Sequence, residues 1–460
     1  MRRRATPRAP ALALGAVLLA CGAPVVAAPQ APRLPQLGTG VAVSHLDGVT
    51  GTVIVQQWSG APAAAVDLWF RAPSVGFGPT AVPSLARVAA QTVAGSKPIV
   101  GPSLGDRVSA VGGRLAITTY GDSVSVAALV PADAARDIVH AMTVAYFSPV
   151  ITDDGFSGAV RDVAMESLIS GFDAPTVLRN LVFSTLFSSG PNHYPVLGSA
   201  KETSSVTLAQ VRTFADRAFR EQNAVLVVSG AVEPSVASAA SHGRSASPDS
   251  AFAAPEDATP SVIAASATPV HQTFDEPAAA DAWIGPPIAH EDEATAMDFI
   301  ADYLFRPGSG IASRAVEEAF PGSFVSGQFI TLRDPGVMFV AFGDGDVAAM
   351  RTIVDRALAG IEHPMNAATF ARARDAFEYH LLSDLQTPSE IADNYGWYSV
   401  EGNAEYAPGP SGSSGRYFGA AAGLTPEFVA SVAAKYLGKP PATAELAPSH
   451  DNPSTTSRPS

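Results

Sequence analysis

The 460-residue sequence has a single cysteine, so no disulfide can form within one chain. Basic residues are also scarce: 29 lysines and arginines stand against 43 aspartates and glutamates, a formal net charge of −14. So acidic a chain repels a phosphate backbone, and no basic stripe with interleaved aromatic residues occurs, so we expect no nucleic-acid binding. The sequence also lacks a Gly-x-x-x-x-Gly-Lys-Ser/Thr loop, which leaves nucleotide use without support.

Residues 1–28 have the pattern of an export signal or a lipoprotein leader. Three arginines at 2–4 precede an apolar stretch at 9–20 that is too short to span a bilayer. Cys21 follows in Leu-Leu-Ala-Cys-Gly, which resembles a bacterial lipobox, whereas ordinary cleavage near Ala27 would discard this cysteine. Both alternatives predict a secreted or bacterial cell-envelope protein, periplasmic or lipid-anchored. Any membrane attachment would depend on a lipid on Cys21.

What the sequence does contain is a long internal repeat. Residues 67–73, Asp-Leu-Trp-Phe-Arg-Ala-Pro, return at 281–287 as Asp-Ala-Trp-Ile-Gly-Pro-Pro, an offset of 214. Two further matches have nearly the same offset: Asp122 with Asp334, and 136–139 with 351–354. These matches predict one folding unit used twice, with Trp69 and Trp283 in equivalent core positions beneath each sheet.

The order of the predicted elements favours an α+β fold. Short apolar runs bounded by turn residues predict strands, 3.6-residue periodicity predicts helices, and the helices gather between adjacent antiparallel strands. We therefore predict two homologous domains, each an antiparallel sheet with helices packed on it. The predicted segments are a leader at 1–28, a first domain at 45–232, an Ala/Ser/Pro-rich linker at 233–268, a second domain at 269–440 and a disordered tail at 441–460.

Four local motifs, in this order and spacing, resemble the pitrilysin/insulinase family of zinc metallopeptidases, and within it the branch of the mitochondrial processing peptidase. The likeness covers about residues 50–440 and rests on the motifs at 93–96, 104–122, 206–230 and 308–314. It implies two peptidase-like halves that close like a clamshell.

The resemblance also shows which chemistry is missing from the first half. Active members carry His-x-x-Glu-His on a helix, where two imidazoles grip zinc and the glutamate activates water. The corresponding positions are Ala86, Ala89 and Ala90, and the third ligand position falls on Ser167. Glu166, one residue away, is favoured as a solvated helix charge. We expect these four positions to face the cleft between the two halves, grouped where zinc would otherwise sit, with no metal bound.

The second half lacks the matching substrate-binding residues. The family's tyrosine falls on Phe324 and its arginine on or near Phe320, and no two of the nine histidines have the spacing of the zinc motif. The resemblance thus implies a catalytically degenerate member, with no catalytic residue, no metal ligand and no cofactor.

We predict an exported, non-catalytic subunit that binds extended peptide, supports a zinc-carrying homologous peptidase and forms a heterodimer with it. Two alternatives stay open: an active zinc peptidase with unrecognised ligands, and a peptide-binding envelope assembly factor without a peptidase partner. Zinc would be a cofactor only under the first alternative.

Three other patterns have simpler explanations. Ser103 lies in Gly-x-Ser-x-Gly, but a helix N-cap is the simpler role than a hydrolase nucleophile. The acidic run after His290 suits a helix N-terminus. Asp344-Gly345-Asp346 lacks the other ligands of a calcium loop and indicates a strand-to-helix turn.

Overall fold

The computed structural model describes residues 41–44, 52–58, 61–77, 80–241, 262–264, 268–333, 335–402 and 415–447. All structural statements below concern the unit Leu37–Ser460. The leader and Cys21 lie outside the described residues. Within the described ranges, no helix combines the length and the apolar character needed to cross a membrane.

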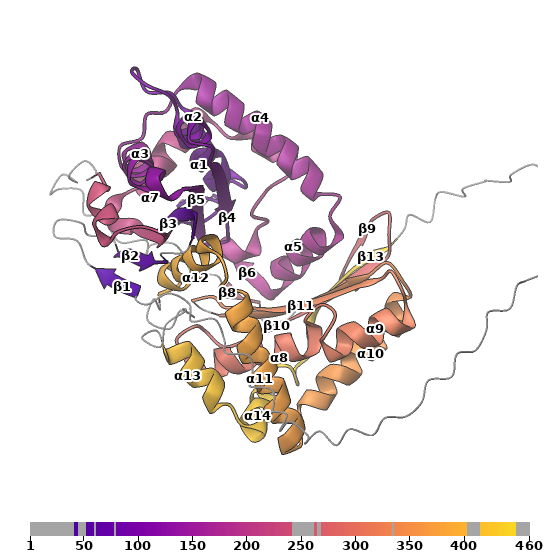
Figure 1. The fold of residues 1–460 in the computed structure, drawn as a ribbon. Coiled ribbons are helices and arrows are strands. Elements are labelled where there is room, and N and C mark those ends of the chain that lie inside the picture. Colours follow the sequence, from indigo (N-terminus) through magenta and orange to yellow (C-terminus); the bar gives the residue numbers. More distant parts are fainter. Residues whose placement is uncertain are drawn as a thin grey trace, which may run out of the picture. The chain divides into compact units, whose positions relative to one another are not determined.

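The first sheet has six strands in the order β1-β2-β7-β3-β5-β4 (Figure 1). Neighbouring strands are antiparallel except for β2 and β7, which are parallel. The central strand β3 is buried along nearly its whole length, because helices cover both of its faces, and it therefore has an almost continuous apolar sequence. The strands are β1 (Val41–Ser44), β2 (Thr52–Gln57), β3 (Ala63–Arg71), β4 (Arg114–Thr119), β5 (Ser123–Pro131) and β7 (Ala224–Gly230).

The second sheet repeats this arrangement with five strands in the order β11-β12-β10-β13-β9. Read in reverse, this order matches β2-β7-β3-β5-β4, and its one parallel pair, β9 with β13, takes the place of β2 with β7. The prediction of an α+β unit used twice is confirmed. The strands are β9 (Val270–Thr273), β10 (Ala278–Ile284), β11 (Phe324–Ile330), β12 (Val337–Gly343) and β13 (Ala442–Ala447).

The predicted tail boundary is wrong at its start, because β13 lies within residues 441–460. Its sequence, Ala-Thr-Ala-Glu-Leu-Ala, has little intrinsic strand preference. Pairing with β10 on one side and β9 on the other stabilises it instead. The predicted linker also contains regular structure, a 3-10 helix at Pro234–Ala239 and the strand β8 (Val262–Ile263), which pairs with β6 (Phe187–Ser189).

The helices follow the same sequence order in both halves. Several begin at a Ser, Thr, Asp or Asn whose side chain accepts a hydrogen bond from a backbone N–H of the first turn. The first half contains α1 (Leu85–Gly95), α2 (Leu104–Ala110), α3 (Ala135–Phe147), α4 (Asp153–Ser170), α5 (Ala174–Leu186), α6 (Ala200–Ser205) and α7 (Leu208–Ala218). The second contains α8 (Glu291–Phe305), α9 (Ile311–Ala319), α10 (Val347–Ile361), α11 (Ala367–Ser383), α12 (Pro388–Val400), α13 (Gly415–Gly423) and α14 (Pro426–Tyr436).

The two halves exchange one helix each. Helix α12 of the second half packs on β3 and β7 of the first sheet, and α5 of the first half packs on β10 and β13 of the second. Trp69 of β3 meets Trp397 of α12, with ring centroids 6.3 Å apart. A Cβ atom on Gly396 would lie 2.0 Å from Trp69 Nε1, so only glycine permits this approach.

The two repeated tryptophans lie on equivalent strands but point to opposite faces. Trp69 faces the exchanged helix α12. On β10, by contrast, Ala282 belongs to the cluster packed against the exchanged helix α5. Asp281 on the alternate face, which it shares with Trp283, contacts Arg351 of α10. The offset of 214 therefore aligns the strands but not their faces, because a shift of one residue along a strand moves every side chain to the other face of the sheet. The prediction of equivalent core positions is wrong in this respect.

Buried polar groups fix the C-terminal end of α12. Arg71 Nε and Arg333 Nη2 each donate a hydrogen bond to the carbonyl oxygen of Val400 at 2.7 Å. Glu401 is buried, accepts from the backbone N–H of Arg333 at 2.9 Å, and shares a hydrogen bond with the carboxyl of Asp122. Burial, together with the Asp122 charge, raises the pKa of Glu401 well above its ordinary value, and burial raises the pKa of Asp122.

We expect the contact between Glu401 and Asp122 to weaken as the pH rises. An acid with a raised pKa in the folded state holds a proton that the unfolded chain releases. The stability that this proton contributes is therefore complete below the ordinary pKa of 4.5 and is lost as the pH rises through the folded-state pKa. Glu401→Gln should flatten this slope, so the variant should gain stability relative to the wild type between about pH 5 and pH 8. Urea unfolding across this range measures it, and exposed Glu317→Gln is the control. Parallel profiles of Glu401→Gln and wild type would contradict the assignment.

Candidate functional site

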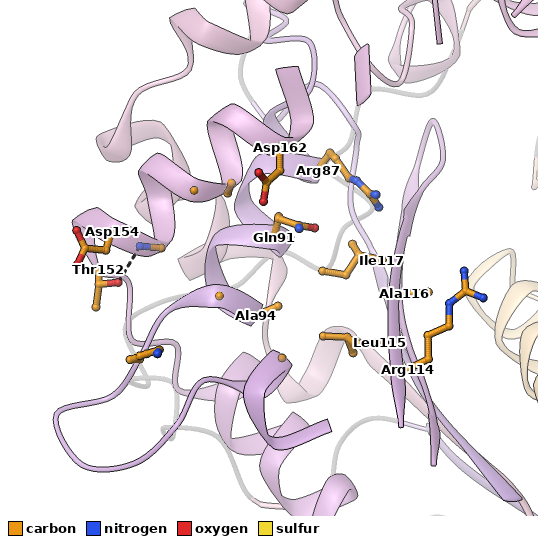
Figure 2. Close-up of a pocket in the computed structure, with 16 residues that line it drawn as sticks. Arg87, Gln91, Ala94, Arg114, Leu115, Ala116, Ile117, Thr152, Asp154 and Asp162 are labelled. Atoms are coloured by element: carbon orange, nitrogen blue, oxygen red, sulfur yellow. Dashed lines mark hydrogen bonds between the residues drawn. The ribbon is translucent and has the colours of Figure 1, made fainter. Parts of the chain in front are cut away.

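Helices α1 and α4 and the edge strand β4 enclose a hollow of about 920 Å³ (Figure 2). Helix α1 contributes Arg87, Gln91 and Ala94, which follow one another at i, i+4 and i+7 and so share one face. Residues 114–117 of β4 form the opposite wall, and Figure 2 shows Ile117 facing Gln91 across the hollow. Among the described strands β4 pairs only with β5, so its other backbone edge is open.

Arg87 and Glu166 form a two-pronged ion pair between α1 and α4. Arg87 Nε donates to Glu166 Oε2 and Nη2 donates to Oε1, both at 3.0 Å. The arginine side chain is only 14% exposed and that of the glutamate 42%, so the pair is partly shielded from solvent. Glu166 is thus a partly exposed helix charge, as predicted, and it is paired with Arg87.

The alanines at the predicted motif positions do not line this hollow. Ala86, Ala89 and Ala90 are fully buried in the apolar core of the first half. On a helix these three share a different face from Arg87 and Gln91, with Ala90 at the border nearest to them. Tyr146 donates a hydrogen bond to the carbonyl oxygen of Ala90 at 2.9 Å. The expectation that the alanines face a hollow is wrong, and their equivalence to the family motif stays a prediction.

Ser167 takes part in a chain of buried hydroxyl groups. Its Oγ lies 3.2 Å from Thr203 Oγ1, which lies 2.8 Å from Ser84 Oγ. Ser84 Oγ also accepts from the backbone N–H of Gly198 at 2.8 Å. These contacts connect the start of α1 with α4 and α6, so Ser167 has a structural role here.

The second-half positions lie apart from the hollow. Phe320 follows α9 and packs against one apolar cluster, while Phe324 begins β11 and packs against the cluster around α5. Neither residue lines the hollow between α1, α4 and β4.

The residues of the hollow do not fit a divalent cation. The guanidinium of Arg87 is a permanent cation without a lone pair to donate, and it occupies both oxygens of Glu166. In the part of the chain that the structure describes, no three His, Cys, Asp or Glu side chains come together as a metal site would need. We therefore derive no step through a metal here.

The simpler explanations of the other patterns agree with the structure. Ser103 accepts a hydrogen bond from the backbone N–H of Asp106 at 3.1 Å and caps α2. Glu293, in the acidic run, accepts from Lys435 at 2.7 Å rather than facing other carboxylates. Asp346 caps α10 directly after β12.

The sheet order, the repeated parallel pair and the helices between them define the fold of the pitrilysin/insulinase, or M16-type, peptidases. A protease from Helicobacter pylori is similar over 88% of this chain and 98% of its own, with a TM-score of 0.75 and 15% identity. An M16 peptidase inactive domain from Pseudomonas fluorescens is similar over 89% and 99%, with a TM-score of 0.71 and 14% identity.

A chain of complex III2 from Candida albicans is similar over 88% of this chain and 96% of its own, with a TM-score of 0.69 and 12% identity. No family model and no curated protein matches in sequence. At these identities the likeness shows the fold alone, so the processing-peptidase-like branch and the loss of catalysis remain predictions.

Proposed function

We propose that this chain is an exported, non-catalytic pitrilysin-like subunit that binds extended peptide and supports a zinc-carrying homologous peptidase. The observation that carries the proposal is the ion pair of Arg87 with Glu166, on a face of α1 that borders the hollow. The proposal of export rests on the leader-like residues 1–28, and the exported chain is either lipid-anchored through Cys21 or cleaved near Ala27.

The ion pair matches the geometry of the zinc motif but not its chemistry. The motif has two ligands one turn apart on α1 and a third on α4. Arg87 and Gln91 lie one turn apart on the face of α1 that borders the hollow, and Arg87 contacts Glu166 of α4, so Ala90 would take the place of the motif's glutamate. An arginine there supplies the positive charge that zinc would supply, yet it cannot polarise water. We therefore propose 87, 90 and 91 as the motif positions.

The open edge of β4 supports the peptide-binding part. An extended peptide can add to an unpaired strand edge through main-chain hydrogen bonds, while alternate side chains enter pockets beside it. Strand β4 offers that edge, and residues 114–117 form one wall of the 920 Å³ hollow. Binding of this kind requires no metal.

An apolar stripe on α4 supports the partner. Three of its residues lie on the last turns of α4 and the fourth, Phe172, lies just beyond the helix end at Ser170. Their side chains are strongly exposed: Met165 56%, Leu168 51%, Ile169 64% and Phe172 71%. A contiguous exposed apolar stripe marks a surface for protein contact. We propose that the homologous zinc subunit covers it.

The test uses the full mature chain. We expect no stoichiometric zinc by elemental analysis, no chelator-sensitive cleavage of an unstructured peptide, and co-purification of a chain with His-x-x-Glu-His from an envelope extract. Leu168→Glu should abolish the co-purification. Val144→Glu is the control: it places the same charge at an exposed apolar residue of α3, outside the stripe, and should leave the co-purification intact. Chelator-sensitive cleavage by the isolated chain would favour the active peptidase. Peptide binding without a peptidase partner would favour the assembly factor.

A further inference from the structure

The second half has its own counterpart of the α1–α4 hollow. Helices α8 and α11 and the edge strand β11 contribute to the walls of a space of about 350 Å³. Asp298, Asp302 and Phe305 line it at i, i+4 and i+7 on α8, the spacing of Arg87, Gln91 and Ala94 on α1. The charge is inverted, because α8 presents carboxylates where α1 presents a guanidinium.

Two of the three carboxylates in this hollow already have basic partners. Asp302 lies 2.9 Å from His380 Nδ1 and 3.4 Å from Arg306 Nη1. Arg306 also donates two hydrogen bonds to Asp384, at 2.9 and 3.0 Å. Together these groups form a network from α8 to α11 in which Asp302 and Asp384 share the arginine.

Asp298 has no such partner in the described part of the chain. It accepts one hydrogen bond, from the hydroxyl of Tyr417 at 2.7 Å. Burial, opposed by the Tyr417 hydrogen bond and assisted by the charge of Asp302, raises the pKa of Asp298 to about 7. A carboxyl group in this state binds a cation readily, because the incoming charge offsets the cost of ionising it.

We propose that this hollow binds one ammonium or guanidinium group, with Asp298 as its counter-ion. Aromatic side chains from four elements line the same space, and their ring faces attract an organic cation: Phe329, Phe377, Tyr398 and Tyr417. A single positive charge balances the single carboxylate that lacks a basic partner. A divalent metal fits less well, because His380 is engaged with Asp302 and the Arg306 guanidinium lies in the same wall.

Two sources could supply such a group. One is a free small amine or guanidine, and the other is a lysine or arginine side chain of a peptide laid along β11. Strand β11 pairs only with β12 among the described strands, and residues 326–329 line the hollow. The inference does not rest on the partner peptidase or on the inactivity of the first half.

The test titrates the full chain with four probes by calorimetry: butylammonium, butylguanidinium, an acetylated and amidated alanine hexapeptide with one lysine, and the same peptide with norleucine. We expect at least one cationic probe to bind and the norleucine peptide not to bind. Tighter binding of the lysine peptide than of butylammonium would identify a peptide side chain as the source, and the reverse a free amine. Asp298→Asn should weaken binding at least about tenfold. Asp292→Asn, at an exposed residue of α8, should leave it unchanged.

A second measurement follows the pH dependence of binding. Because Asp298 must be ionised to pair with the cation, affinity of the unmodified chain should fall as the pH drops from about 8 to about 6. Asp298→Asn separates this dependence from any contribution of His380, Asp302 or Arg306. Failure of both free cations and the lysine peptide to bind would overturn the proposal. Undiminished binding by a folded Asp298→Asn variant, or tighter binding of zinc chloride that Asp302→Asn abolishes, would also overturn it.

Discussion

Replacing Arg351 by methionine should lower the free energy of unfolding by about 3–5 kcal/mol. Arg351 Nη1 donates to both oxygens of Asp281, at 2.6 and 2.5 Å, and Thr443 Oγ1 donates to the same carboxylate at 3.0 Å. The aspartate side chain is 1% exposed on the central strand β10. Methionine retains the volume but leaves a buried negative charge without its counter-ion, and the loss of that partner sets the size of the effect.

A double-variant cycle separates the charge from the packing. Asp281→Asn in the Arg351→Met background removes the unpaired charge, so it should recover much of the lost stability. Arg356→Met, at an exposed arginine of the same helix, should change the unfolding free energy by no more than about 0.5 kcal/mol. Denaturant unfolding of the wild type, Arg351→Met, Asp281→Asn and the double variant measures the cycle. Equal losses in the single and double variants would assign the effect to packing instead.

The element order could be read from the sequence because strand and helix periodicities are local. The helix exchange could not, since periodicity identifies a helix but not the sheet that it covers. Helix α12 did carry a signal, because its apolar residues spread over a wide arc of the helix; Ile391, Ala392, Tyr395 and Val400 are among those that are buried. A helix with so wide an apolar surface needs cover on more than one face. Here the first sheet provides part of that cover.

The expectation that Ala86, Ala89 and Ala90 face a hollow failed for a physical reason. The resemblance fixed the motif by counting from Gly95, whereas the face that borders the hollow is set by which side chains the core can bury. The core buries the alanines and leaves Arg87 and Gln91 at its edge. Two polar residues one turn apart in an otherwise apolar helix were the available signal.

Restoring the zinc motif in the proposed register should bring zinc content from none to about one ion per chain. The substitutions are Arg87→His, Ala90→Glu and Gln91→His, with Glu166 kept as the third ligand. They place both imidazoles on the face that borders the hollow and release Glu166 from its ion pair. Elemental analysis and a zinc-dependent rise in melting temperature measure the result. Arg87→Met is the control, because it frees Glu166 without adding a ligand.

The alternative register should behave in the opposite way. Ala86→His, Ala89→Glu, Ala90→His and Ser167→Glu insert four larger side chains, three of them where the alanines are fully buried. Each such overpacking costs about 1–3 kcal/mol, before the cost of burying ionisable groups. The register at 87, 90 and 91 overpacks the core at Ala90 alone, so the variant at 86, 89 and 90 should lose more stability and should unfold or lose cooperativity. A folded, zinc-binding chain in this register, with none in the other, would return the motif to Ala86, Ala89 and Ala90. Even a zinc-loaded chain should cleave peptide slowly, since Phe324 has no hydroxyl for the oxyanion and one such donor is worth about 3–4 kcal/mol.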